Sequence, residues 1–212
     1  MKHNSDIEAI LKIHNQGIKL DIGCGGNKQP GFVGLDVRKL PGVDIVQDIE
    51  KFPWPLPNES VSFAMASHVL EHITKGRTDP KLVGLVSLLI DKKIISSKEA
   101  EKYLGETDPG SIMIRFFDEV WRVMKPGGQF ILAMPYGGTS YEYQDPTHLS
   151  PIVPALFAYF DPLTQNSVLY SIYRPLPWKV VRCTFDISGF IECIMDKRVI
   201  DKSYGVLSKI PA

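Results

Sequence analysis

Short apolar runs separated by polar turns divide the chain into candidate strands. Before residue 140 these runs lie at residues 18–22, 32–36, 43–49, 60–67 and 129–135. Each run has the length of a strand, and the last two have the composition of buried strands. Two further runs, Trp178–Ile187 and Phe190–Met195, are joined by Ser188-Gly189 and predict an antiparallel hairpin.

Apolar residues at helical spacing predict helices in three further segments. Residues 5–15 begin with a capping box and end before Gly17. Residues 112–124 repeat apolar side chains at helical spacing, and Lys125-Pro126-Gly127-Gly128 then stops the helix. Residues 157–160 predict a short helix that packs on the sheet.

Residues 75–110 predict a helical insertion after the fourth strand. Residues 82–90 are too apolar for a solvated helix, and Ser96–Glu99 is a capping box that opens a second helix through Leu104. An insertion at this point would stand at the mouth of a site at the strand ends. A substrate lid, a homodimer surface and a plain packing segment are all compatible with it.

The turn between the first two strands carries the clearest chemical pattern. It contains Gly23, Gly25 and Gly26, and the second strand ends at Asp36. Glycines let the backbone approach a ligand closely, and a carboxylate at a strand tip can accept two hydrogen bonds from a ribose diol. The pattern predicts a nucleotide-like ligand outside the carboxyl ends of parallel strands.

The spacing of this turn argues against a dinucleotide. A G-x-G-x-x-G fingerprint would place its third glycine where Lys28 stands, and its acid about 20 residues further on. Asp36 lies only 13 residues beyond Gly23, which leaves little room for a helix whose N-terminus holds a pyrophosphate. Residues 27–31 have the composition of a turn instead.

Composition places the chain among ordinary globular proteins. The 212 residues are 44% hydrophobic and 23% charged, and 24 basic side chains balance 24 acidic ones. We expect one domain over residues 1–212, with no net charge to favour nucleic acid or an anionic membrane. The start of the chain does not resemble a signal peptide and no apolar run could span a bilayer, so a cytoplasmic location is expected. Three separated cysteines predict neither disulfides nor a metal site.

Three motifs follow one another in the chain. They are D-x-G-x-G at Asp21, Gly23 and Gly25, SFAMASHVLEH at residues 62–72, and a helix-K-P-G-G-strand turn at residues 125–128. In this order, over residues 18–195, they resemble the class I S-adenosylmethionine-dependent methyltransferases, and within that class the type 11 methyltransferases. The resemblance implies an α/β fold with a doubly wound, mostly parallel seven-stranded sheet and a C-terminal antiparallel hairpin. The chain departs from the family in its shortened first crossover and in Ser62, where an acid is usual.

The resemblance implies that S-adenosyl-L-methionine is the cofactor. The implied cofactor-binding residues are Asp21, Gly23, Cys24, Gly25, Asn27, Asp36, Asp48, Ile49, Ser67 and His68. The pair Asp48-Ile49 suits an adenine, because a carboxylate can accept from the exocyclic amine while an aliphatic side chain packs on the ring. A turn or capping role for Asp48 is the alternative. Glu71 and His72 are interpreted as hydrogen-bonding residues at a helix start rather than as catalytic residues.

The polar loop at residues 136–148 follows the carboxyl end of the fifth strand and faces the ligand side. Methyl transfer needs an aligned acceptor and, where the acceptor carries a proton, a base. His148 is the candidate base, Asp145 could orient it, and Tyr136 is the third candidate catalytic residue. The sequence Asp145–His148 is also favourable turn chemistry, which leaves a structural role open.

The expected acceptor is a small-molecule or metabolite-like O or N nucleophile, because the neutral chain offers nucleic acid no electrostatic advantage. Two alternatives remain. One is a cofactor-binding module that has lost its chemistry, and the other is an NAD-type oxidoreductase of the same architecture. No membrane partner and no metal is expected, and the insertion is the candidate homodimer surface.

Overall fold

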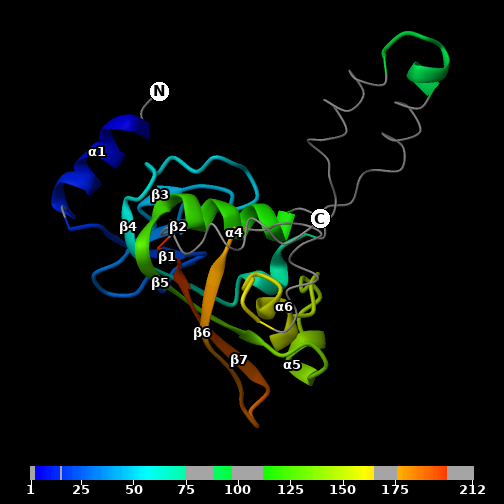
Figure 1. The fold of residues 1–212 in the computed structure, drawn as a ribbon. Helices are drawn as coiled ribbons and strands as arrows, with labels where there is room; N and C mark the ends of the chain where they lie inside the picture. The colour runs from blue at the N-terminus through cyan, green and yellow to red at the C-terminus, as the bar shows by residue number, and fades with distance from the viewer. Residues whose placement is uncertain (1–2, 15, 75–87, 97–111, 165–175, 200–212) are drawn as a thin grey trace.

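The computed structural model describes residues 3–14, 16–74, 88–96, 112–164 and 176–199. Within them the chain forms a seven-stranded sheet in the order β3-β2-β1-β4-β5-β7-β6 (Figure 1). The strands are β1 (Ile18–Ile22), β2 (Val33–Asp36), β3 (Ile45–Val46), β4 (Val61–Ser67), β5 (Met124–Pro135), β6 (Trp178–Phe185) and β7 (Phe190–Lys197). Strands β1 to β5 are parallel, and β7 runs antiparallel to β5 and β6. The mostly parallel seven-stranded sheet with its C-terminal hairpin is therefore confirmed.

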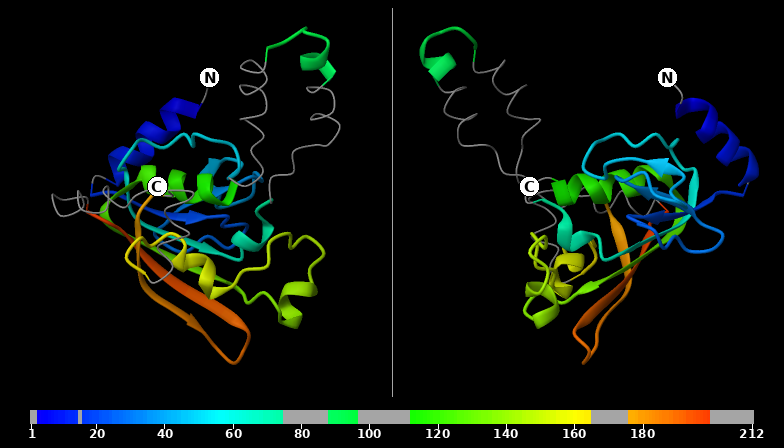
Figure 2. Two further views of the ribbon diagram at one scale, coloured as in Figure 1. Left: turned by 45° about the vertical axis from the view of Figure 1, so that its right-hand side comes forward. Right: turned by 180° about the vertical axis from the view of Figure 1, so that it is seen from behind.

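The strand order changes direction at β1. Strands β2 and β3 extend the sheet to one side of β1, and β4 extends it to the other. Open α/β sheets bind ligands at such a switch point, beyond the carboxyl ends of the strands. Away from this point the β6–β7 hairpin reaches past the rest of the sheet, and α1 lies at the end of the molecule opposite α5 (Figure 2).

Helix α4 (Ile112–Val123) lies across one face of the sheet (Figure 1). Its residues Phe116, Phe117 and Val120 are completely buried, as their helical spacing predicts. The ring centroid of Phe117 lies 6.1 Å from that of Phe130 on β5 and 6.3 Å from that of Trp178 on β6. These aromatic contacts join α4 to both the parallel strands and the hairpin.

The remaining described helices are short. They are α1 (His3–Ile13), the 3-10 helix η1 (Leu70–His72), α5 (Ser140–Tyr143) and α6 (Pro154–Ala158), with further helical residues at 88–91. In the part of the chain that the structure describes, no helix has the length and apolar character needed to cross a membrane. The rest of the predicted insertion at 75–110 lies outside the described residues.

The loops that join β1, β2, β3 and β4 contain no helix in the described residues, so the doubly wound expectation is met only in part. The first loop, residues 23–32, is the turn that the sequence predicts. The next two pass through Pro41-Gly42 and through Pro53, Pro55 and Pro57. Proline fixes its own backbone and lacks an N–H group, which opposes helix formation there.

Two charged residues of α4 hold the proline-rich loop between β3 and β4. The Glu119 Oε1 atom accepts hydrogen bonds from the Trp54 N–H and from Arg122 Nη2, each at 2.5 Å. Arg122 also donates to the carbonyl oxygens of Leu56 at 2.8 Å and Trp54 at 3.1 Å. This ion pair satisfies backbone groups that a crossover helix would have satisfied internally.

Several predicted boundaries are wrong. Strand β3 has two residues instead of the predicted run 43–49, because Asp48 begins a turn in which its Oδ1 accepts the Glu50 N–H at 3.0 Å. The K-P-G-G turn belongs to β5, which starts at Met124 and shifts its register against β4 before Gln129. Helix α5 falls in a segment expected to be a loop, and only the short η1 is described where a longer helix was expected after β4.

The buried pair on α4 generates a stability prediction. Replacing Glu119 by alanine leaves the Trp54 N–H and the Arg122 guanidinium without their acceptor. We expect the free energy of unfolding, measured in urea, to fall by about 3–5 kcal/mol, as for other broken buried ion pairs. The control is Glu192→Gln, which breaks an exposed pair with Arg182 and should cost less than about 1 kcal/mol. Equal losses in the two variants would contradict this account.

Candidate functional site

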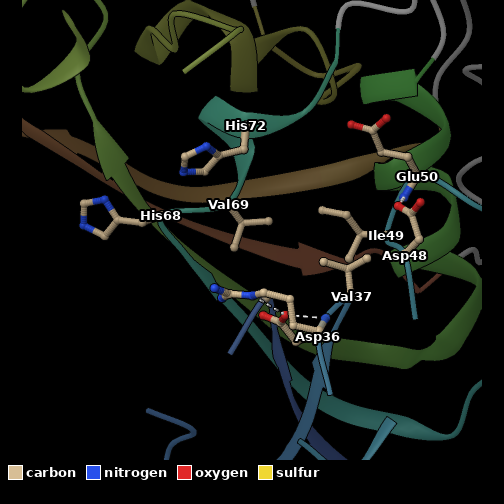
Figure 3. A pocket seen from close by; sticks show the side chains of 10 residues that line it. Asp36, Val37, Asp48, Ile49, Glu50, His68, Val69 and His72 are labelled. Carbon is tan, nitrogen blue, oxygen red and sulfur yellow. Dashed lines mark hydrogen bonds and ion pairs between the residues drawn. The ribbon is translucent and has the colours of Figure 1, made fainter. Parts of the chain in front are cut away.

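A pocket of about 420 Å³ lies at the carboxyl ends of β1, β2 and β4. Ligand sites in proteins commonly enclose about 300–1,000 Å³, so the volume suits a small molecule. The residues that line it are Gly23, Asp36, Val37, Arg38, Asp48, Ile49, Glu50, His68, Val69 and His72. Figure 3 shows Asp36 on one wall of the pocket and His68 and His72 on the opposite wall.

The turn after β1 is closed against the end of β2. The N–H groups of Gly23 and Cys24 donate to the Leu35 carbonyl at 2.7 and 3.2 Å, and the Gly25 N–H donates to Asp36 Oδ2 at 2.9 Å. Gly23 has a φ of +68°, and a Cβ built on it would lie 2.5 Å from Val69 Cγ2. Only glycine fits this position, because any side chain would be strained and would also collide with the pocket wall.

Asp36 is the buried anion of this wall. Its Oδ1 accepts hydrogen bonds from the Arg38 N–H at 2.9 Å and from Arg38 Nε at 3.2 Å, in addition to the bond at Oδ2. Burial alone would raise the pKa of Asp36, but the bonds from Arg38 and Gly25 lower it below its usual value. The carboxylate is therefore ionised at neutral pH, and about one of its four lone-pair sites remains for a ligand.

The residues after β3 form the adjacent wall. Asp48 turns the chain so that Ile49 and Glu50 follow it into the pocket. The Glu50 carboxylate then accepts hydrogen bonds from the Thr74 N–H at 2.7 Å and from Thr74 Oγ1 at 2.8 Å. This contact ties the loop after β3 to the end of η1, which carries the opposite wall.

His68 begins that opposite wall. Its φ of +56° is unusual for a residue other than glycine, and its N–H donates to the Ala133 carbonyl at 2.8 Å. The Nδ1 atom lies 3.2 Å from Oε1 of Glu71, a side chain with no solvent exposure. The carboxylate of Glu71 raises the pKa of His68 above its ordinary value, although burial opposes the shift.

The structure brings half of the predicted cofactor residues into the pocket. The lining includes Gly23, Asp36, Asp48, Ile49 and His68. The other five lie beside it and shape the turn and the strand ends: Asp21, Cys24, Gly25, Asn27 and Ser67. Asp21 Oδ2, for example, accepts the Gln29 N–H at 2.9 Å, and burial raises the pKa of the Cys24 thiol to about 11.

Of the three predicted catalytic residues, Asp145 and His148 lie near each other, and Tyr136 packs elsewhere. The Tyr136 ring packs on Phe185 of the hairpin, with 4.5 Å between centroids. Asp145 Oδ1 accepts hydrogen bonds from the Thr147 N–H at 2.8 Å and from Thr147 Oγ1 at 2.7 Å. These bonds are those of a turn, which is the structural role that the sequence leaves open for residues 145–148. Asp145 Oδ2 lies 3.9 Å from His148 Nε2, beyond hydrogen-bond range. Of the three, only His148 reaches the pocket wall, through its ring contact with His72 at 4.8 Å.

Sequence reasoning missed five lining residues, which are Val37, Arg38, Glu50, Val69 and His72. Three of them directly follow predicted site residues and Arg38 is two residues beyond one, so proximity to Asp36, Ile49 and His68 could have indicated these four. The motif at residues 62–72 predicts a structural role for His72 at a helix start. No local pattern marks it as part of the pocket.

Comparison with known proteins gives similarity of fold at low sequence identity. No family model matches the sequence, and no curated protein matches it. Many solved structures that match are S-adenosylmethionine-dependent methyltransferases. One from Aquifex aeolicus is 12% identical with a TM-score of 0.45, covering 93% of this chain and 94% of that chain. One from Archaeoglobus fulgidus is 16% identical with a TM-score of 0.46, covering 90% and 93%.

A third similar structure is the 16S rRNA (adenine(1408)-N(1))-methyltransferase of Catenulisporales acidiphilia. It is 15% identical with a TM-score of 0.48, and the match covers 95% of this chain and 94% of that chain. Identities this low, at these TM-scores, transfer no activity to this chain. Its function is therefore inferred from the pocket itself.

Proposed function

We propose that this chain binds S-adenosyl-L-methionine in the pocket at the ends of β1, β2 and β4 and catalyses methyl transfer to a small-molecule acceptor. The sulfonium of that cofactor supplies a methyl group already activated for attack by a nucleophile. The protein must then align the acceptor and, where needed, accept its proton. The residues around the pocket offer groups for both tasks.

The closed turn after β1 is the observation that carries this proposal. The N–H groups of Gly23, Cys24 and Gly25 all donate to the end of β2, and no helix follows them before Val33. A dinucleotide pyrophosphate is held by free N–H groups at a helix N-terminus. The turn therefore favours an adenosyl ligand without phosphates over NAD.

The charge of the pocket supports the same ligand. Asp36, Asp48 and Glu50 contribute three carboxylates, and the one guanidinium among the described lining residues belongs to Arg38, whose Nε atom already donates to Asp36. Carboxylates in a partly enclosed site attract a cation and repel phosphate. We assign the ribose hydroxyls to Asp36 and the adenine to Asp48 and Ile49.

On the acceptor side we assign the role of base to His148. Its Nδ1 lies 2.8 Å from the Glu142 carbonyl, an oxygen that can only accept, so the Nδ1 carries the proton and Nε2 is free to take another. Asp145 shapes the turn that holds this ring, and Tyr136 supports the hairpin beside it. The acceptor is then an O or N nucleophile that approaches past His72.

Calorimetry with S-adenosylhomocysteine and with NAD tests the choice of cofactor. We expect S-adenosylhomocysteine to bind to the chain and NAD not to bind. Asp36→Asn should weaken binding at least about tenfold, a loss of about 1.4 kcal/mol, because the ribose loses a charged acceptor. The matched variant Asp186→Asn, in the hairpin turn outside the lining, should bind as the parent does. Binding of NAD alone would replace this proposal with the oxidoreductase alternative.

The same Asp36→Asn variant should lose stability in a pH-dependent way. We expect its free energy of unfolding at neutral pH to be lower by about 1.5–3 kcal/mol, since hydrogen bonds to a charged acceptor are lost. The folded pKa of Asp36 lies below its ordinary value of 3.8, so this stability is present above that value and is lost as the pH falls through the folded pKa. Urea unfolding at neutral and acid pH should show the difference between parent and variant shrinking in acid.

Formation of S-adenosylhomocysteine with a panel of hydroxyl and amine metabolites, and with RNA in parallel, tests the acceptor class. We expect turnover with members of the small-molecule panel and a large loss in His148→Ala. Turnover with RNA alone would overturn the small-molecule assignment. Cofactor binding without turnover on any acceptor would favour the binding-module alternative.

A further inference from the structure

The side chain of Glu71 has no solvent exposure and lacks the partners that a buried carboxylate needs. Neither carboxylate oxygen meets hydrogen-bond geometry with any residue that the structure describes. His68 Nδ1 lies 3.2 Å from Oε1, and the other oxygen has no such neighbour among the described residues. A buried anion of this kind is costly unless a cation completes its surroundings.

His72, next to Glu71 in the chain, uses only its Nδ1 in the hydrogen bonds of the described residues. Its Nδ1 lies 3.2 Å from the Thr147 carbonyl and 3.1 Å from Thr147 Oγ1. The hydroxyl proton of Thr147 is already donated to Asp145 Oδ1 at 2.7 Å, so Oγ1 can only accept from the ring. Both contacts place the proton on Nδ1, and the Nε2 lone pair of His72 is left free.

His148 is arranged in the same way. Its Nδ1 donates to the Glu142 carbonyl at 2.8 Å, so its Nε2 also carries a free lone pair. Its side chain is only 8% exposed and its ring packs edge-on against that of His72. Histidines that bind metals usually donate their second N–H to a carbonyl or carboxylate, which is the arrangement that both rings show.

The backbone fixes these residues beside one another although they are far apart in the chain. The carbonyl of Glu71 accepts the N–H groups of Leu149 at 2.7 Å and Ser150 at 3.0 Å. Ser150 Oγ donates to the Ile73 carbonyl at 2.9 Å in a buried contact. The loop that carries His148 is thus fastened directly to η1.

We propose that Glu71, His72 and His148 bind a divalent transition-metal ion at the edge of the pocket. One potential ligand atom from each lies within 4.8 Å of the others. Atoms bound to one ion at about 2.1 Å are typically about 3.0–3.5 Å apart, so binding would draw the most distant ligand atoms together by about 1.5 Å. Two imidazoles and one carboxylate suit Zn²⁺, Mn²⁺, Fe²⁺ or Co²⁺ better than Mg²⁺ or Ca²⁺, which prefer oxygen. His68, whose Nδ1 lies 3.2 Å from Oε1 of Glu71, would orient that carboxylate.

Three protein ligands leave coordination positions open toward the pocket, because His72 lines it. An oxygen of an acceptor in such a position would be oriented and made more acidic by the ion. This consequence rests on the proposed function, and it favours a hydroxyl acceptor over an amine. In the loaded chain His148 would act as a metal ligand, and the acceptor proton would pass to solvent.

Metal binding is tested on the untagged full chain after dialysis against a chelator. Co²⁺ is titrated while its visible absorption is recorded, and Zn²⁺ affinity is measured by competition with a chromogenic chelator. We expect one ion per chain, with weak binding of Mg²⁺. Glu71→Gln and His148→Ala should each weaken binding at least about tenfold, the size of effect known for altered metal surroundings.

Matched variants keep the test decisive. Glu71→Gln preserves volume and removes a buried charge, so the chain should stay folded, as circular dichroism will show. His14→Ala, on the far side of the molecule, and a Cys183→Ser/Cys193→Ser double variant should bind the ion as the parent does. Absence of a saturable single site, or equal affinity in Glu71→Gln and the parent, would overturn the proposal. Calorimetry with S-adenosylhomocysteine on the metal-free chain separates this failure from failure of the proposed function.

Discussion

The carboxylate of Asp36 fixes the geometry on which the pocket depends. It accepts the Gly25 N–H from the turn after β1 and the Arg38 N–H from the loop after β2, so two chain segments meet at one buried anion. A charged acceptor bonds about twice as strongly as a neutral one. A single side chain thereby holds together a crossover that has no helix. A bound diol would have to share the remaining acceptor capacity of this carboxylate with bonds that are already made.

Side chains also take the place of a crossover helix at other points along the sheet. Between β3 and β4, Glu119 and Arg122 of α4 satisfy the backbone of the loop that carries Trp54. Glu50 fastens the loop after β3 to Thr74. Each contact pairs a carboxylate with a backbone N–H group that a longer helix or strand would have satisfied by itself. The pocket walls are therefore built from loops whose positions depend on a few acids.

The strands and α4 could be predicted because their evidence is local. Apolar periodicity and turn residues placed β1, β2, β4, β5 and the hairpin, and the site residues Asp36 and His68 follow from their positions at the carboxyl ends of β2 and β4. The short β3 could not be predicted, because the side chain of Asp48 ends the strand by bonding the Glu50 N–H.

The relation between His72 and His148 also escaped prediction. It depends on the Glu71 carbonyl accepting two N–H groups from a loop much further along the chain, and no sequence period reveals such a bond. The expected pairing of Asp145 with His148 is loose, at 3.9 Å between Oδ2 and Nε2, because Thr147 offers Asp145 nearer donors. Long-range backbone contacts and local competition for donors are what a single sequence conceals.

The fastening of residues 149 and 150 to η1 has a consequence for how this protein can vary. The chain leaves the sheet region after Thr74, which Glu50 holds, and returns through α4, which the aromatic core holds. Lengthening a connection between two fixed points costs little free energy, since closure entropy grows only with the logarithm of length. The length of chain between these two fixed points can therefore change, in evolution or by engineering, at little cost to the contacts that hold the pocket walls.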